Sequence, residues 1–328
     1  LWYPTNEQPM NARLVRAISF SLCLAGGIAA LVYAAHPASA TASVTLASGS
    51  DGSRSTIPVT INGQRASCTL DTGTSVILVS SSVAAAAGLD ARAGTFEVAP
   101  DGHTYVDRQT QIERFGVAGS TLHNVPALIS SNLGGQSALC GYDFFTHFPT
   151  LIDRQRRLVT LFPAASHLAH MHCITVNLTP HVPLATVEIN GTWLDHVVLD
   201  SGMAGGGALW DGVRSKLRQP LVADANYVTM PAAIREGLAC GAVASVRYAP
   251  GSPSSAMPIC TEPQHPDGYN GIIETNLDTV RAMAVDYPHH HVCFDVASYA
   301  APPSVRVQHA LPRDAWARFN YFRPPKRR

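Results

Sequence analysis

The sequence predicts a mainly β protein built from two related lobes. The first observation is a pair of short strings, Leu70-Asp71-Thr72-Gly73 and Leu199-Asp200-Ser201-Gly202, whose aspartates are 129 positions apart. The second is that each string follows an alternating apolar segment with an Asn-Gly turn, which is typical of a β-hairpin. The third is that the likeness continues downstream at matched spacing. Such a repeat indicates two copies of one structural unit.

The first copy begins with a hairpin. Residues 57–61 alternate in polarity, Asn62-Gly63 supplies the turn, and a second strand leads to Leu70 and Asp71. An Asn-Gly pair between two apolar runs is a strong short-range hairpin signal. We therefore expect Asp71 at the end of a buried strand.

The second copy repeats this order. Residues 185–189 alternate, Asn190-Gly191 supplies the turn, and residues 197–199 lead to Asp200. We expect Asp200 to occupy the same place in the second lobe as Asp71 in the first.

A short helix is predicted after each aspartate. In the first copy it covers residues 83–87, with serines at 80–82 to cap it and Gly88 to end it. In the second copy residues 208–217 are assigned to the corresponding helix.

A further hairpin is predicted between residues 95–98 and 104–107, around the turn Pro100-Asp101-Gly102. The second lobe shows no equally clear hairpin at this place, so we expect only one.

The register of the repeat continues to the end of each copy. Gly141 is followed twelve positions later by Asp153, and Glu274 is followed at the same interval by Asp286. We interpret the two later aspartates as hairpin-turn residues. The predicted lobes are residues 41–166 and 172–300, with a His-rich connector at 167–171 and a tail at 301–328.

The first forty residues are predicted to lie outside the fold. An apolar run at residues 17–35 follows Arg13 and Arg16 and ends near Ala38-Ser39-Ala40, the pattern of a signal peptide and its cleavage site. The run is also long enough to remain as a membrane anchor. We expect an exported protein, periplasmic or secreted, with either a cleaved leader or a tether.

Composition excludes some partners. The 328 residues are 46 % hydrophobic and 14 % charged, as in a globular protein long enough for two domains. The formal net charge is zero, so nothing in the charge favours a nucleic acid partner.

Six cysteines follow residue 40, an even number that suits disulfides in an exported protein. Cys240 and Cys260 bracket a loop rich in Pro, Ser and Gly and are the pair we expect. Cys68 and Cys140 lie in apolar, strand-like segments and are interpreted as buried thiols.

Two aspartates in duplicated positions suggest one shared site. Carboxyl groups about 3 Å apart cannot both ionise, so such a pair holds a single proton. One group can then activate water while the other protonates a carbonyl oxygen, which hydrolyses an amide without a metal or cofactor. We expect Asp71 and Asp200 to form this pair, and we expect no cofactor.

Each lobe resembles a retropepsin-type aspartic protease domain of the kind found in bacteria, over most of residues 55–296. The features that match are the apolar strand, Asp-Thr/Ser-Gly, the helix, the hairpin and the later apolar-apolar-Gly. The resemblance implies two β-barrel lobes related by a pseudo-twofold axis, with the site in a cleft between them. It also implies an endopeptidase that takes peptide or protein substrates.

The resemblance assigns roles to neighbouring residues. Thr72 and Ser201 would link the two aspartate loops, with Gly73 and Gly202 forming tight turns beside them. Thr74 would donate to the Asp71 carboxylate, whereas its counterpart Met203 cannot, so the two aspartates should differ electrostatically.

Support for the loops and cover for the substrate are assigned in the same way. Gly141 would pack behind the first aspartate loop. The hairpin with Asp101 and Gly102 at its turn would cover the substrate, and Tyr105 would contact it.

Glu274 departs from this pattern, which wants a glycine there. A buried glutamate needs space and a partner. A rival interpretation is therefore a non-catalytic peptide- or envelope-binding protein with the same fold. A third is a homodimer in which each lobe pairs with a lobe of another chain; the duplication favours a monomer.

The run His289-His290-His291 invites a metal interpretation. Adjacent residues of a strand point to opposite faces, which is poor geometry for chelation. We expect an exposed turn and no metal site.

Overall fold

The computed structural model describes residues 41–48, 54–92, 94–98, 104–131, 133, 136–163, 165–179, 181–203, 206–223, 239–262, 269–277 and 279–297. The chain divides after Ala40, and every described residue belongs to the unit that begins at Thr41. The segment predicted as a leader or tether and the C-terminal tail therefore lie outside the described residues. Within the described part of the chain, no helix is long and apolar enough to cross a membrane.

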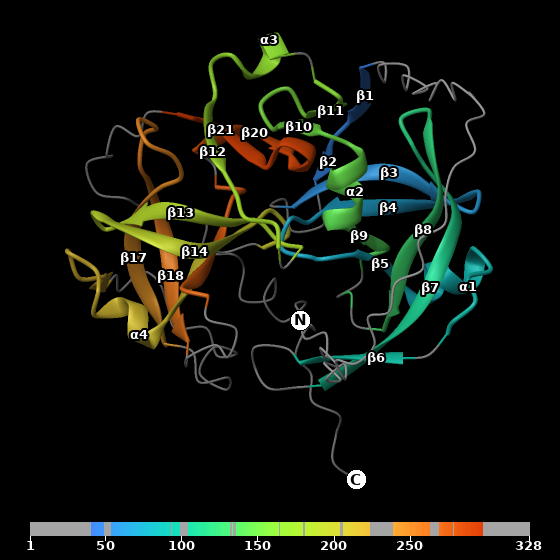
Figure 1. Ribbon diagram of the computed structural model, residues 1–328, viewed down its shortest axis with the longest axis horizontal. Coiled ribbons are helices and arrows are strands. Elements are labelled where there is room, and N and C mark those ends of the chain that lie inside the picture. The colour runs from blue at the N-terminus through green and yellow to red at the C-terminus, as the bar shows by residue number, and fades with distance from the viewer. Residues whose placement is uncertain are drawn as a thin grey trace, which may run out of the picture. The chain divides into compact units, whose positions relative to one another are not determined.

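The first lobe is built on an eight-stranded sheet (Figure 1, blue to green). Its strands run in the order β2 (Ala47–Ser48), β3 (Ser55–Ile61), β4 (Gln64–Leu70), β9 (Ala138–Cys140), β5 (Ile77–Ser80), β8 (Ser120–Ser130), β7 (Thr104–Val117) and β6 (Gly94–Val98). The pairs β4–β9 and β5–β8 are parallel, and β3 also pairs with β7, which closes the sheet on itself.

The second lobe repeats this order (Figure 1, yellow to orange). Its strands are β13 (Leu184–Ile189), β14 (Thr192–Asp200), β19 (Gly271–Glu274), β15 (Gly207–Trp210), β18 (Ser255–Glu262), β17 (Ala239–Arg247) and β16 (Val222–Ala223). The parallel pairs are β14–β19 and β15–β18, which correspond to β4–β9 and β5–β8 of the first lobe, and β13 pairs with β17 as β3 pairs with β7. The predicted fold class, mainly β with two related lobes, is confirmed.

A third sheet joins the lobes. Its order is β1 (Ala42–Thr45), β11 (Leu158–Leu161), β10 (Thr150–Asp153), β20 (Val280–Asp286), β21 (His291–Val296) and β12 (His172–Thr175). Each lobe contributes three strands, and β10 pairs antiparallel with β20 where they meet. Because the two halves follow in mirrored order, the junction has the pseudo-twofold arrangement that the resemblance implies. We call this the joint sheet.

The helices are short. They are α1 (Ser81–Ala86), α2 (Tyr142–His147), α3 (Ala165–Leu168), α4 (Asp211–Arg214) and the 3-10 turn η1 (Tyr287–His289). The helix predicted after Asp71 is present as α1, where the Ser80 hydroxyl accepts the Val83 N–H at 3.3 Å. Gly88 follows with φ +65°.

The helix predicted at residues 208–217 is largely wrong. Residues up to Trp210 form β15, which lies between β18 and β19, and only Asp211–Arg214 are α-helical. The strand Gly207–Trp210 is buried at every position. A short apolar run covered on both faces has no periodicity that distinguishes a strand from a helix.

Both Asn-Gly turns are confirmed. Asn62 and Gly63 have φ of 49° and 87°, and Asn190 and Gly191 have φ of 47° and 75°. Positive φ at both central residues is the geometry that suits the right-handed twist of a hairpin.

The interpretation of Cys68 and Cys140 as free thiols is wrong. They form a disulfide between β4 and β9, which are neighbouring parallel strands. Cys173 and Cys293 form another between β12 and β21. Cys260 is also disulfide-bonded, and its expected partner Cys240 lies outside the residues whose side chains are described.

The downstream aspartates serve turns, as predicted. Asp153 accepts the Arg156 backbone N–H at 2.8 Å, and Asp286 contacts the His289 ring at 2.8 Å. The residues 289–291 are exposed, and the described residues include no group of three or more side chains placed to hold a metal ion.

Candidate active site

The two repeated strands bring Asp71 and Asp200 together. Asp71 follows the end of β4, and Asp200 is the last residue of β14. Asp71 is buried, Asp200 is half-buried, and their carboxyl groups are hydrogen-bonded to each other. The arrangement places one carboxyl group from each lobe at a single point.

Thr72 and Ser201 connect the two aspartate loops. The Thr72 N–H donates to the Ser201 hydroxyl at 3.0 Å, and the Ser201 N–H donates to the Thr72 hydroxyl at 3.0 Å. Each hydroxyl in turn donates to a carbonyl of the opposite lobe, Thr72 to Leu199 at 2.7 Å and Ser201 to Leu70 at 2.8 Å. Four buried hydrogen bonds therefore fix the two aspartate loops against each other. They involve only hydroxyl and backbone groups, so they form whether or not the aspartates are ionised.

The next residue in each loop must be glycine. A Cβ on Gly73 would lie 2.6 Å from the Asp200 carboxyl carbon, and one on Gly202 would lie 2.2 Å from that of Asp71. Their N–H groups donate to the aspartate of their own loop, at 2.9 Å and 2.6 Å. Each glycine thus supplies a donor and leaves room for the other lobe's carboxylate.

The surroundings shift the pKa values of the two carboxyl groups by different amounts. Burial raises the pKa of Asp71, while hydrogen bonds from Thr74 and Asp200 and the positive charge of Arg54 oppose that rise. Burial raises the pKa of Asp200 well above its usual value, and the negative charge of Asp71 raises it further. The surroundings therefore favour the protonated form of the pair, and the pKa rises further at Asp200 than at Asp71.

Met203 accounts for part of this difference. On the Asp71 side the Thr74 side chain lowers the pKa of the carboxyl group. On the Asp200 side the Met203 backbone N–H donates at 3.0 Å, with no side-chain donor from that position. The two half-sites are therefore unequal, as the comparison of Thr74 with Met203 predicted, although that comparison gave no direction.

Gly141 and Glu274 occupy equivalent positions in the two lobes, but the surrounding structure differs. Glu274 lies opposite Asp200 in the β14–β19 ladder, just as Gly141 follows β9 beside Asp71. A Cβ on Gly141 would lie 2.3 Å from the Thr74 carbonyl oxygen, so no side chain fits there. In the first lobe the glycine is therefore a requirement of packing.

The second lobe makes room for Glu274 with a longer loop. Leu78 pairs with the residue two positions before Gly141, and Ala208 pairs with the residue two positions before Glu274. Asp71 to Leu78 is seven positions, whereas Asp200 to Ala208 is eight. The loop after Asp200 therefore contains one extra residue.

The Glu274 carboxylate binds this longer loop. Its Oε2 accepts the Gly206 N–H at 2.7 Å, and the Glu274 N–H donates to the Gly206 carbonyl at 2.9 Å. Gly206 has φ +119°, and a Cβ there would lie 2.1 Å from the Pro258 carbonyl oxygen. The Tyr248 hydroxyl donates to the Glu274 carbonyl at 2.6 Å. Glu274 is thus a buried and partnered residue that holds the loop of the second aspartate.

Two further residues near the dyad were not predicted. Asn276 donates through its side-chain amide to the Ser201 carbonyl oxygen. Tyr287 of η1 is 2 % exposed, and burial followed by the charges of Asp71 and Asp200 raises its pKa well above the usual value. The sequence offered one indication of these two residues: both lie in the part of the second copy, after Glu274, whose spacing matches the first copy.

The two strands of the hairpin expected over the site are present as β6 and β7. Thr95 pairs with Asp107 and Glu97 pairs with Tyr105 in the β6–β7 ladder. Asp101 and Gly102 lie outside the described residues, and the Tyr105 side chain is not described. In the second lobe β16 pairs with β17 at the equivalent edge, and residues 224–238 between them lie outside the described part, so a single flap stays a prediction.

One protein-family model and a solved structure resemble parts of this chain. Residues 57–147 match the family model of the gag-polyprotein putative aspartyl protease. A solved structure, a retropepsin-like aspartic protease from Rickettsia conorii, is 19 % identical over 37 % of this chain and 91 % of its own, with a TM-score of 0.29. No curated protein matches the chain. The predicted likeness to the retropepsin-like aspartyl protease family is confirmed.

Proposed function

We propose that this protein is an aspartic endopeptidase whose catalytic residues are Asp71 and Asp200. The observation that carries the proposal is the hydrogen-bonded carboxyl pair, one group from each lobe, held by the Thr72 and Ser201 crosslink. A pair that shares one proton contains both the base and the acid that amide hydrolysis needs.

The stronger rise in the pKa of Asp200 supports the roles that we propose for the two groups. Asp71, the carboxylate, takes a proton from a water molecule whose oxygen attacks the scissile carbonyl carbon. Asp200 gives its proton to the carbonyl oxygen. When the tetrahedral intermediate collapses, the C–N bond breaks and the leaving nitrogen receives a proton from Asp71, while the hydroxyl proton returns to Asp200. The dyad ends the cycle with one proton, as it began.

The substrate would be an extended peptide segment in a cleft between the lobes. The β6–β7 hairpin is the element that would cover it, and its backbone would pair with the peptide as an added strand does. We propose Asp101, Gly102 and Tyr105 as the hairpin residues nearest the substrate.

The rival function, binding without turnover, drew its support from Glu274 and Met203. Glu274 is bonded to Gly206 in a loop long enough to accept it, and the Met203 backbone donates to Asp200. Neither residue is therefore a reason to regard the second half-site as inactive.

We also propose that the protein is exported and acts as a monomer. Two disulfides and a further disulfide-bonded Cys260 suit an oxidising compartment. Both aspartates of the pair come from one chain, which removes the need for a second copy.

Cleavage of a mixed peptide library from about pH 3 to 7.5 tests the proposal, since the dyad must hold one proton in the active range. Wild type should cleave, and Asp71→Asn and Asp200→Asn should each abolish cleavage while remaining folded. Absence of cleavage by folded wild type at every pH would refute the protease function. Activity regained on mixing the two variants would refute the monomer, because lobes of different chains would then pair.

A further inference from the structure

At the joint sheet, each lobe places one residue against the other lobe. The two residues are equivalent in the repeat, because Arg154 follows Asp153 and Tyr287 follows Asp286. Arg154 of the first lobe is hydrogen-bonded to the second lobe, and Tyr287 of the second lobe packs on the first. The contacts across the junction are therefore reciprocal.

Arg154 binds the segment that follows β19. Its backbone N–H donates to the Arg281 carbonyl at 2.9 Å, which extends the β10–β20 ladder by one bond. Its Nη1 donates to the Leu277 carbonyl at 2.9 Å and also to the Asn276 carbonyl. One half-buried guanidinium group of the first lobe thus fixes two successive carbonyls of the second.

Asn276 connects this segment to the dyad. It is 5 % exposed, and its side-chain amide donates to the Ser201 carbonyl oxygen. Ser201 follows Asp200 and exchanges hydrogen bonds with Thr72 of the other aspartate loop. A continuous path of hydrogen bonds and backbone therefore runs from Arg154 to the loop that carries Asp200.

Arg154 also places a positive charge near the buried carboxylate of Glu274. The Tyr248 hydroxyl donates to the Glu274 carbonyl at 2.6 Å. Burial raises the pKa of Tyr248 well above its usual value, the negative charge of Glu274 raises it further, and the positive charge of Arg154 opposes the rise. Both charges thus act on one hydroxyl inside the second lobe, where a buried carboxylate needs an opposite charge.

Tyr287 makes the reciprocal contact without a charge. Its ring centroid lies 5.6 Å from that of Tyr142 and 5.5 Å from that of Phe145, both in α2. The Tyr142 N–H donates to the Thr74 carbonyl at 2.9 Å, which joins α2 to the first aspartate loop. Aromatic packing therefore supports the first half-site where hydrogen bonds from Arg154 support the second.

We propose that Arg154 is a positioning residue for the second half-site, and that it holds the Asp200 loop through Asn276. The first lobe then supplies a side chain on which the geometry of the other lobe's aspartate depends. The expected effect on catalysis rests on the proposed function, whereas the expected effect on the loop does not.

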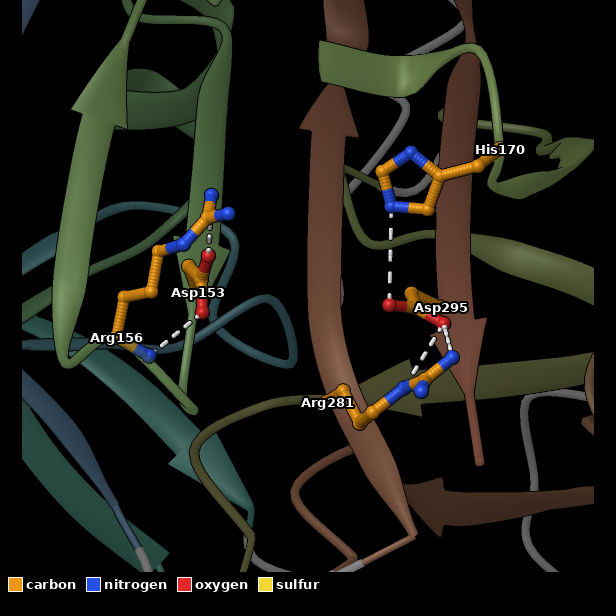
Figure 2. A network of polar contacts seen from close by, with 5 residues as sticks. All are labelled: Asp153, Arg156, His170, Arg281 and Asp295. Carbon is orange, nitrogen blue, oxygen red and sulfur yellow. Dashed lines mark hydrogen bonds and ion pairs between the residues drawn. The ribbon is translucent and has the colours of Figure 1, made fainter. Parts of the chain in front are cut away.

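The backbone amide resonances of Ser201 and Gly202 in the full chain test this proposal without turnover. Arg154→Met, which keeps the length of the side chain but removes its donors, should move both resonances, and Arg154→Lys, which keeps the charge and a donor, should move them less. Arg156→Met is the matched control and should leave them in place. Arg156 lies on the same turn, contacts Asp153 at 3.5 Å and has an 81 % exposed side chain (Figure 2).

Unmoved resonances in Arg154→Met, or equal movement in Arg156→Met, would overturn the proposal. The route through Asn276 is tested by adding Arg154→Met to Asn276→Ala. In that background the second change should no longer move the Ser201 resonance, and a full displacement there would overturn the route.

Kinetics with one peptide substrate test the effect on catalysis. Arg154→Met should lower kcat about tenfold and leave KM within about twofold, because the dyad moves while the peptide-binding surface does not. Asn276→Ala should act alike, and the double variant should lose no more than either single one. Multiplied losses would overturn the shared route. A wild type without activity would refute the protease function, and the amide resonances would still decide the role of Arg154.

Discussion

Replacing Glu274 tests whether this residue is a defect or a structural part of the second half-site. Its carboxylate accepts the Gly206 N–H at 2.7 Å in the buried interior. If that contact holds the Asp200 loop, Glu274→Gly weakens the protein even though glycine is the residue of the first lobe. If Glu274 is a tolerated intrusion, Glu274→Gly improves the site.

The magnitude follows from the contact that is lost. Glu274→Gly and Glu274→Ala leave the Gly206 N–H without this acceptor, and a buried donor without a partner costs about 1–3 kcal/mol. Glu274→Gln keeps an oxygen but not the charge, and charged hydrogen bonds exceed neutral ones by about 1 kcal/mol. The free energy of unfolding should therefore fall in the order wild type, Gln, Ala, with Gly at or below Ala because it frees the unfolded backbone.

Urea denaturation near pH 5 measures these differences, and kcat and KM are measured with one peptide substrate under the same conditions. A residue that positions the Asp200 loop should lower kcat more than it changes KM. Glu188→Ala is the control, because it removes another carboxylate of the same lobe. The Glu188 side chain is 19 % exposed and paired with Arg247, and its loss should cost less than about 1 kcal/mol. A Glu274→Gly protein as stable and as active as wild type would refute the reasoning.

Three further changes probe the rest of the site. Asp200→Asn removes a carboxyl group whose pKa is raised on folding. The stability from such a group is present below its unfolded pKa and is lost as the pH rises through its folded pKa. The melting temperature of the variant, measured by calorimetry, should therefore exceed that of wild type near pH 7.5 and exceed it by less near pH 4. An equal gain at both values would contradict this. Thr72→Val leaves the buried Ser201 N–H without its acceptor and should lower the unfolding free energy by about 1–3 kcal/mol, whereas Thr72→Ser should retain it. Gly141→Ala places a Cβ 2.3 Å from a backbone carbonyl oxygen and should lower the melting temperature sharply, whereas Gly212→Ala, in open space, should not; equal melting of the two would show that the loop yields.

Features set by local chemistry could be predicted from the sequence. The Asn-Gly turns require only two residues with positive φ, and both hairpins formed where they were expected. The matched spacing from Gly141 to Asp153 and from Glu274 to Asp286 also placed the two later aspartates at equivalent turns, at the ends of β10 and β20.

Features set by distant neighbours could not be predicted in this way. Cys68 and Cys140 are 72 positions apart and meet only because β9 inserts beside β4 in the folded sheet. Residues 208–210 became a strand because β18 and β19 cover them from both sides. In both cases the structure depends on a contact between segments that are far apart in the sequence. Local periodicity and residue spacing cannot predict such a contact.

Glu274 shows how a residue that breaks a local pattern can still be consistent with the fold. Its counterpart Gly141 faces a short loop whose carbonyls leave no room for a Cβ. The second lobe has an extra residue in that loop and a glycine, Gly206, whose backbone turns toward the carboxylate. Both departures are visible in the sequence, but taken one at a time they look like unrelated irregularities. The longer loop accommodates Glu274, and Glu274 supplies an acceptor for the Gly206 N–H, so the two departures depend on each other. Restoring glycine at position 274 alone should therefore leave the longer loop without its anchor.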